Sequence, residues 1–286
     1  MAAMIGLIKW KEATDHGGQQ PAEPFRIAGN LYYVGANDVA AFLITGPDGH
    51  ILIDGGYPGT APMIMESIAQ LGFNIRDVRV LLNSEPHFDH AGGLSELQKA
   101  SGAELWASEA SADAIVSGGA HADNFLPYNI LVWSGILRYP AARVDHRFRD
   151  DERIRVGPVE VTAHITGGHS RGCTSWSFPV RDGERELRVV SACSLTLLPG
   201  MSLVEPESYP GIRADFERTF GVLRSLPVDI WVTSHAKEFG RYRKFLERDK
   251  AQTPADPFID REGYFKYIDK GEEKFRRLLA EQEGHR

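Results

Sequence analysis

Four side chains that can ligate a metal ion lie within six residues of the sequence. They are Glu85, His87, Asp89 and His90. The apolar run 78–82, Val-Arg-Val-Leu-Leu, predicts a buried strand directly before them, and the glycine pair 92–93 predicts a sharp turn into a helix directly after them. A strand end and a tight turn hold such side chains at one point, which is how a metal site is built.

The spacing of these ligands fits two metal ions better than one. Glu85, His87 and Asp89 alternate along the chain, whereas Asp89 and His90 are adjacent, so one face of the loop cannot carry all four. Two overlapping pairs, Glu85 with His87 and Asp89 with His90, suit two neighbouring ions. Carboxylate and imidazole ligands without thiolate favour Zn²⁺, with iron or manganese as the alternatives.

Each pair needs a further protein ligand, because a catalytic zinc ion has three protein ligands and an open position for water. Two histidines elsewhere in the chain can supply them. His169 lies in a glycine-flanked loop between strand-like runs at 159–163 and 174–178, and His235 follows the buried-strand pattern 230–234. In α/β proteins, functional side chains gather at the ends of strands.

The elements that must position these residues follow a regular pattern. Strand-like runs at 31–34, 41–45 and 51–53 predict an opening meander, after which helix and strand alternate. The expected helices span 61–71, 94–101, 110–116, 215–226 and 261–282, and the later strands span 78–82, 105–107 and 230–233, with hairpins over 153–193. Two halves, each first strand-rich and then helical, predict two sheets face to face with helices outside.

The segment 118–149 has weak periodicity and many turn-forming residues. It carries the aromatic side chains Phe125, Tyr128, Trp133 and Tyr139. One interpretation is a loop that its aromatic side chains fold onto the core. The other is a mobile wall over the active site, and the sequence leaves both open.

The composition indicates one compact domain. The 286 residues are 42% hydrophobic, enough for a large core, and no linker-like stretch or composition break divides the chain. The net charge is −7 and no basic stripe is present, so nucleic-acid binding gains no support. No apolar run reaches the length of a transmembrane helix.

Two cysteines, Cys173 and Cys193, are too few for a disulfide framework. Cys173 follows the His169 loop and Cys193 ends an apolar strand, so we expect buried free thiols, with a bridge as the alternative if their strands are neighbours. The first ten residues lack a basic region and a long apolar stretch, so they are not typical of a signal peptide.

Taken in order, these motifs resemble those of the metallo-β-lactamase superfamily. The series is Asp54-Gly55-Gly56, Glu85-Pro86-His87-Phe88-Asp89-His90, Gly168-His169 and Ser234-His235. The resemblance runs from about Phe25 to the C-terminal helix, which implies an N-terminal extension 1–24 and a metallo-β-lactamase domain 25–286. Within the superfamily, the stretch 168–176 resembles the third subclass. The one departure is Glu85, because the family usually has histidine at this position.

The resemblance implies a fold and a set of functional residues. The fold is an αβ/βα four-layer sandwich, in which two mixed sheets lie face to face, helices cover the outer faces and metals bind at one edge. The implied ligands are Glu85, His87 and His169 for one Zn²⁺ ion and Asp89, His90 and His235 for the other. Asp54 is implied as a buried carboxylate that supports the ligands. Ser194 and Thr196 are candidates to bind the substrate carboxylate, or else plain strand-end hydroxyls.

The implied activity is zinc-dependent hydrolysis of the β-lactam ring of penicillins, cephalosporins and carbapenems, and hence antibiotic resistance, in a bacterial periplasm. Zinc would activate water, and the ion at Asp89 would stabilise the leaving nitrogen, so Asp89 is the expected catalytic residue. Because a glutamate ligand makes the bound water less acidic and binds zinc less well than imidazole, we expect the Glu85 site to be the weaker one. A monomer without nucleic-acid or membrane partners is expected.

Two other functions are weighed against this one. A zinc hydrolase of lactones or thioesters shares the fold, but such relatives usually carry a metal-bridging aspartate at the end of the strand that here spans 190–194. No acidic residue occurs between Leu187 and Val204. This absence favours β-lactam hydrolysis over hydrolysis of lactones or thioesters. A non-catalytic zinc module would need closed four-ligand sites, whereas six ligands shared between two ions leave open positions.

Overall fold

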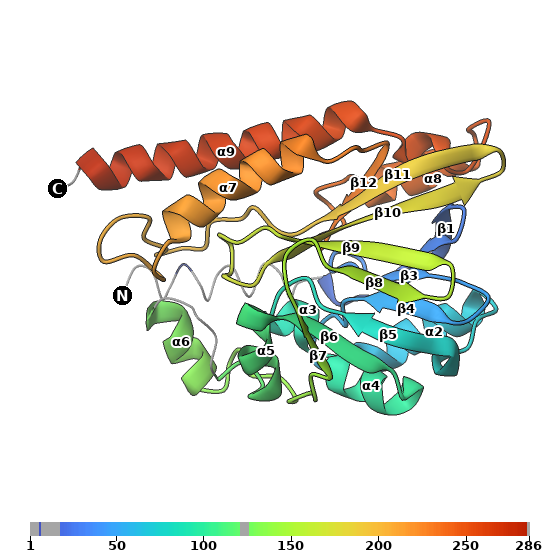
Figure 1. The fold of residues 1–286 in the computed structure, drawn as a ribbon, viewed down its shortest axis with the longest axis horizontal. Helices are drawn as coiled ribbons and strands as arrows, with labels where there is room; N and C mark the ends of the chain where they lie inside the picture. The colour runs from blue at the N-terminus through green and yellow to red at the C-terminus, as the bar shows by residue number, and fades with distance from the viewer. Residues whose placement is uncertain (1–5, 7–17, 121–125, 285–286) are drawn as a thin grey trace.

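Two β-sheets lie face to face, and helices cover the outer face of each (Figure 1). The computed structural model describes residue 6 and residues 18–120 and 126–284. Within these ranges, seven strands form the first sheet, in the order β1-β2-β3-β4-β5-β6-β7, and five form the second, in the order β12-β11-β10-β9-β8. The four-layer αβ/βα sandwich expected from the sequence is confirmed.

The first sheet changes from antiparallel to parallel at β4. Its strands are β1 (Phe25–Ala28), β2 (Leu31–Tyr33), β3 (Phe42–Ile44), β4 (His50–Ile53), β5 (Val78–Leu82), β6 (Glu104–Ser108) and β7 (His146–Phe148). Strands β2 to β4 form the predicted antiparallel meander, β1 extends it, and β4 to β7 pair in parallel. Because β4 and β5 are parallel neighbours, Asp54 and the loop after Leu82 leave the sheet at the same edge.

The second sheet brings the remaining motifs to one edge. Its strands are β8 (Arg153–Val156), β9 (Val159–Ile165), β10 (Thr174–Asp182), β11 (Arg185–Ala192) and β12 (Ile230–Thr233). Strands β8 to β11 are the predicted antiparallel hairpins, and β12 pairs with β11 in parallel. The carboxyl ends of β11 and β12 therefore lie together, and the loops that carry Ser194 and His235 start there.

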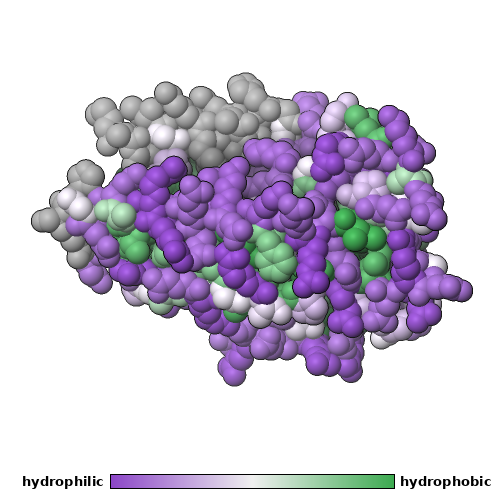
Figure 2. Space-filling view, turned by 90° about the horizontal axis from the view of Figure 1, so that it is seen from above, coloured by the Kyte–Doolittle hydropathy of each residue, from purple (hydrophilic) through white to green (hydrophobic). Residues whose placement is uncertain are grey.

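Helices cover the two outer faces. The first sheet is covered by α2 (Ala61–Gln70), α4 (Leu94–Ser101) and α5 (Glu109–Val116), and the second by α7 (Ile212–Ser225), α8 (Arg241–Arg248) and α9 (Arg261–Gly284). In α9 the buried residues Tyr264, Ile268, Gly271 and Phe275 recur every three or four positions. The outer face of this layer is mostly hydrophilic, as the view from above shows (Figure 2). None of the helices in the described ranges is long and apolar enough to cross a membrane.

The described residues also form shorter elements. They are the α-helices α3 (Phe88–Ala91) and α6 (Leu126–Trp133) and the 3-10 helices η1 (Ile75–Asp77) and η2 (Asp256–Phe258). The sequence prediction reproduced the bounds of β5, α4 and β12, but it missed β1, β7, α6 and α8. The missed strands have only three or four residues, and α8, Arg-Tyr-Arg-Lys-Phe-Leu-Glu-Arg, has too few apolar residues for a periodic signal. The proposed boundary between residues 24 and 25 stays a prediction.

The glycine pair 92–93 forms the turn between α3 and α4 and also allows close packing. Both residues have ordinary negative φ angles, −59° and −91°. A Cβ atom on Gly92 would lie 2.2 Å from the backbone nitrogen of Pro58, and one on Gly93 would lie 2.3 Å from the carbonyl oxygen of Gly55. The predicted turn into the next helix is therefore confirmed, although it needs no positive φ, and the absent side chains let the loops after β4 and β5 touch.

Candidate metal centre

The loops after β5 and β9 bring one carboxylate and two imidazoles together. Glu85, His87 and His169 are buried, and a ligand atom of each lies within 4.8 Å of the other two. Glu85 Oε2 is 2.8 Å from His87 Nδ1 and 2.8 Å from His169 Nε2. These two nitrogens are 3.1 Å apart. Three lone-pair atoms therefore face a single point.

A second triangle lies beside the first. Asp89, His90 and His235 also have ligand atoms within 4.8 Å of one another. Asp89 Oδ2 is 3.4 Å from His90 Nε2 and 3.8 Å from His235 Nε2. The other carboxylate oxygen of Glu85, Oε1, is 3.5 Å from His90 Nε2, so the triangles are neighbours. Helix α3 begins after His87 and curls the backbone, which separates the four local side chains into two pairs.

The residues present fit a metal ion. Among the described residues, both carboxylate oxygens of Asp89 in the second triangle are buried polar atoms without a hydrogen-bond partner. A buried polar atom without a partner costs about 1–3 kcal/mol, so a protein rarely keeps several in one place without a ligand for them. Imidazole nitrogen and carboxylate oxygen are ligands that suit Zn²⁺.

The charges in the two triangles favour a cation. Burial on its own raises the pKa of Glu85, yet the imidazoles of His169 and His90 outweigh burial and hold that pKa well below its usual range. Burial lowers the pKa of His90, but the carboxylates of Asp89 and Glu85 overcome this and raise it to about 10. The carboxylates therefore stay ionised and stabilise a positive charge placed between them, whether a proton or a metal ion.

Asp54 supports the loop and does not join either triangle. Its Oδ1 accepts hydrogen bonds from the backbone N–H of Ser84 at 2.7 Å and from the side chain of Asn83 at 3.2 Å. Burial raises the pKa of Asp54 to about 6, against the opposing influence of His90 and of the Ser84 hydrogen bond. Its φ of 65° is unusual for a residue with a side chain. The supporting role toward the metal ligands, which the resemblance implies, stays a prediction.

The backbone carbonyl of Thr196 accepts a hydrogen bond from His169 of the first triangle. Its carbonyl oxygen lies 2.6 Å from His169 Nδ1, so this nitrogen donates a proton to it and His169 Nε2 keeps its lone pair for a ligand. The Ser194 side chain is buried and accepts a hydrogen bond from the backbone N–H of Thr196 at 3.2 Å. The role of both hydroxyls in substrate binding stays a prediction.

Asp38 is a supporting residue that sequence reasoning missed. Its Oδ2 lies 3.4 Å from His235 Nδ1 and 3.2 Å from the ammonium of Lys237. Burial raises the pKa of Asp38, but His235 and Lys237 lower it by more. An antiparallel bridge between Val39 and His235 brings these distant segments together. A single aspartate in a loop carries no local signal of this contact.

Two tyrosines of the segment 118–149 contact the loop after β5, which carries Glu85 and His87 and is called the metal loop below. The Tyr139 hydroxyl donates to the carbonyl oxygen of Pro86, between Glu85 and His87, at 2.7 Å. The Tyr128 ring lies 5.0 Å from the His87 ring, centroid to centroid. Aromatic packing onto the core is therefore confirmed for these two side chains, whereas Trp133 is 63% exposed. Phe125 lies outside the described residues.

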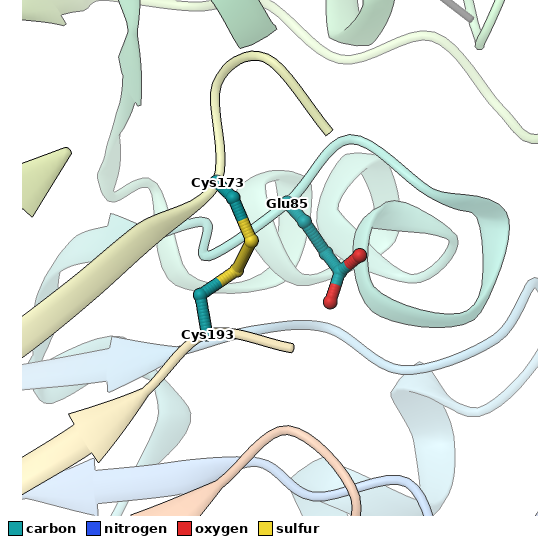
Figure 3. Close-up of side chains that lie close together, drawn as sticks. All are labelled: Glu85, Cys173 and Cys193. Carbon is teal, nitrogen blue, oxygen red and sulfur yellow. A yellow bond between two sulfur atoms is a disulfide. The ribbon is translucent and has the colours of Figure 1, made fainter. Parts of the chain in front are cut away.

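Cys173 and Cys193 form a disulfide bridge (Figure 3). The expectation of free thiols is therefore wrong, and the alternative is right. Cys173 stands directly before β10 and Cys193 directly after β11, and these strands are neighbours, so the two Cα atoms are 5.9 Å apart. This separation is within the usual range for a bridge.

Comparison with known proteins gives a consistent result. The family model "Metallo-beta-lactamase superfamily" matches residues 34–235. The native FEZ-1 metallo-β-lactamase from Legionella gormanii is 36% identical, over 92% of this chain and 98% of that chain, with a TM-score of 0.86. BJP-1, a subclass B3 metallo-β-lactamase of Bradyrhizobium japonicum, is 32% identical, over 95% and 99% of the chains, with a TM-score of 0.85.

A third solved structure is the class B3 di-zinc metallo-β-lactamase LRA-12 from an Alaskan soil metagenome. It is 32% identical, over 93% of this chain and 97% of that chain, with a TM-score of 0.84. The sequence motifs and the fold both agree with these comparisons. The chain therefore belongs to the metallo-β-lactamase superfamily, and within it is similar to enzymes of subclass B3.

Proposed function

We propose that this chain is an antibiotic-resistance enzyme that hydrolyses the β-lactam ring of penicillins, cephalosporins and carbapenems with zinc. The observation that carries the proposal is the pair of adjacent, buried ligand triangles at the sheet edge. Three similar solved structures are themselves named metallo-β-lactamases, one of them a di-zinc enzyme. Because the three structures share this fold and are all named for the same reaction, the comparison favours that reaction for this chain.

The proposed ligands are the members of the two triangles. Glu85, His87 and His169 would hold one Zn²⁺ ion, and Asp89, His90 and His235 the other. Zinc held there supplies an acidified water and polarises a carbonyl oxygen. Asp89 is the proposed catalytic residue, because its carboxylate would hold an ion whose charge could stabilise the leaving nitrogen.

Two oxygen atoms hold the histidines in the orientation this chemistry needs. The Thr196 carbonyl and the Asp38 carboxylate each face the Nδ1 atom of a histidine, His169 and His235 respectively. A proton fixed on Nδ1 leaves Nε2 as the only lone pair, and Nε2 is the atom that faces the triangle in both residues. The hydroxyls of Ser194 and Thr196 are the proposed partners of the substrate carboxylate.

Glu85 sets the affinity of the first ion. Its negative charge attracts a cation more strongly than histidine would, but zinc prefers imidazole at similar geometry and glutamate has more torsions to order. We expect the second group of effects to win, so the first site is the weaker one. The Ser234 hydroxyl, 3.4 Å from Glu85 Oε1, restrains the carboxylate only loosely.

The disulfide and the end of β11 refine the proposal. A bridge between Cys173 and Cys193 fits an oxidising compartment such as the bacterial periplasm. Related lactone and thioester hydrolases usually carry a metal-bridging aspartate at the end of this strand, where this chain has Cys193 and Ser194 and no acidic residue. The bridged side chain cannot act as such a ligand, which disfavours those substrates.

One experiment tests the proposed function. The purified, zinc-loaded protein is assayed against a penicillin, a cephalosporin, a carbapenem, a lactone and a thioester. We expect turnover of the β-lactams, its loss after dialysis against a chelator, and its recovery when Zn²⁺ is added back. Turnover of the lactone alone, or full β-lactam turnover in protein shown by elemental analysis to hold no metal, would refute the proposal.

A further inference from the structure

The disulfide lies against a proposed zinc ligand. Both sulfur atoms stand on the side of the bridge that faces the Glu85 side chain (Figure 3). A carboxylate oxygen of Glu85 and the Sγ atoms of Cys173 and Cys193 all lie within 4.8 Å of one another, and all three residues are buried. With the bridge reduced, these side chains would offer two thiolates and one carboxylate, a set of ligands that suits zinc. The disulfide removes this set, because a cysteine sulfur binds metal well as a thiolate and poorly as part of a disulfide.

We propose that the chain in its reduced form binds one thiophilic divalent cation, Zn²⁺ or Cd²⁺, through Cys173, Cys193 and Glu85, and that disulfide formation closes this site. The cysteine site has no part in the proposed hydrolysis and does not depend on it. Its consequence for that reaction is competition for Glu85, whose Oε2 otherwise faces His87 and His169. The bridge reserves this carboxylate for the histidines, and only this last step rests on the proposed function.

The positions of the two cysteines do not depend on the bridge. Strands β10 and β11 are paired from Trp176 opposite Ser191 down to the hairpin turn, and this pairing sets the distance between the cysteine Cα atoms. The backbone N–H of Thr174 also donates to the Ser84 carbonyl at 2.8 Å, which ties the start of β10 to the loop that carries Glu85. The reduced chain therefore keeps the three side chains together.

The geometry suits a single ion. Two thiolates on one zinc ion stand about 3.8 Å apart, because each Zn–S bond is about 2.3 Å long and the angle is near tetrahedral. Cysteines whose Cα atoms are 5.9 Å apart reach this separation by rotation about the Cα–Cβ bonds, without movement of the strands. Sulfur ligands also select Zn²⁺ or Cd²⁺ over harder cations.

A competing arrangement exists for the reduced chain. The sulfur of Cys193 lies 3.3 Å from the Ser84 carbonyl oxygen, and that of Cys173 lies 3.8 Å from the Ser194 carbonyl oxygen. Two neutral thiols could donate to these oxygens and bind no metal. Thiols are weak donors, whereas metal–thiolate bonds supply much larger free energies, so metal binding wins when a cation is present.

The test uses the full chain, prepared from expression onward with a water-soluble trialkylphosphine. Phosphorus loses two electrons and takes the oxygen atom of a water molecule, and the two protons of that water go to Cys173 and Cys193. Metal binding then releases both protons. The probe is Co²⁺, because cobalt bound to thiolate shows an intense near-ultraviolet charge-transfer band that cobalt bound to imidazole or carboxylate lacks.

We expect this band in the reduced protein, saturating at one Co²⁺ per chain, and its absence in the oxidised protein. The matched control, Cys173→Ser with Cys193→Ser, should show no band in phosphine while its far-ultraviolet circular dichroism stays that of the oxidised protein. In reduced Glu85→Gln the cobalt dissociation constant should rise at least tenfold.

Three outcomes overturn the proposal: a folded, reduced protein without the band, a band that Glu85→Gln leaves unchanged, and a reduced chain whose circular dichroism shows that it does not fold. Hydrolysis by the oxidised, zinc-loaded protein is measured in parallel. Its absence would refute the proposed function and leave the cysteine site standing, so the two failures are distinguishable.

Discussion

Tyr139 offers a direct test of how the metal loop is held. Its hydroxyl donates to the Pro86 carbonyl at 2.7 Å, and the side chain is 6% exposed. Tyr139→Phe removes the donor and leaves a buried carbonyl without its partner, which costs about 1.5 kcal/mol of unfolding free energy. For a chain of this size the melting temperature should fall by roughly 3 °C.

The same change should weaken one metal site selectively. Pro86 stands between Glu85 and His87, so loss of the hydrogen bond frees the backbone of two ligands of the first triangle. If most of the lost free energy is spent on ordering this loop, the zinc dissociation constant of the first site rises about tenfold, since 1.4 kcal/mol corresponds to a factor of ten. The second triangle should keep its affinity.

Tyr264→Phe is the matched control. The Tyr264 hydroxyl also donates to a buried carbonyl, that of Leu223, at 2.8 Å, but it does so where α9 packs on α7. Both variants should lose similar stability in urea unfolding of the metal-free protein, and zinc affinity is measured by competition with a chromophoric chelator. Equal zinc affinities in the two variants would show that the Tyr139 hydrogen bond supports the fold alone, and the reasoning would fail.

Three further predictions concern charge. Asp89→Ala should reduce kcat by at least a hundredfold while circular dichroism stays unchanged, and a folded variant that holds two zinc ions at near-normal turnover would contradict the assignment. Glu85→His should tighten the first site and lower the zinc concentration needed for full activity, as a chelator-competition titration can check; unchanged affinities would remove the argument. Burial alone raises the pKa of Asp260, but the Lys244 ammonium 2.8 Å away outweighs it and lowers that pKa. Since this pKa is depressed in the folded state, its stabilisation is present above the unfolded value of about 3.9 and is lost as the pH falls through the folded value. Asp260→Asn, which leaves Lys244 buried without its counter-charge, should therefore be about 1–2 kcal/mol less stable in urea at pH 7, since the partial exposure of Asp260 screens the pair. This difference should shrink below pH 4; a difference independent of pH would contradict the pairing.

The sequence by itself determined the chemistry of the site and the elements with a strong local signal. Glu85, His87, Asp89 and His90 are close in sequence, so their types and spacing alone predict two metal-binding pairs. The buried strand β5 and helix α4 were predicted with their observed bounds, because an apolar run or a helical period is a property of a few consecutive residues. The type of each side chain and the spacing of neighbouring residues along the chain are the same before and after folding.

Only the tertiary structure decided what supports the ligands. The contacts of Asp38 with His235 and of Tyr139 with Pro86 join segments that no local pattern connects. The bridge between Cys173 and Cys193 depended on whether β10 and β11 are neighbours, which the cysteines themselves do not encode. Such contacts arise from strand order and loop packing, which are set by burial of the whole core, so the residues that make them look ordinary until the chain is folded.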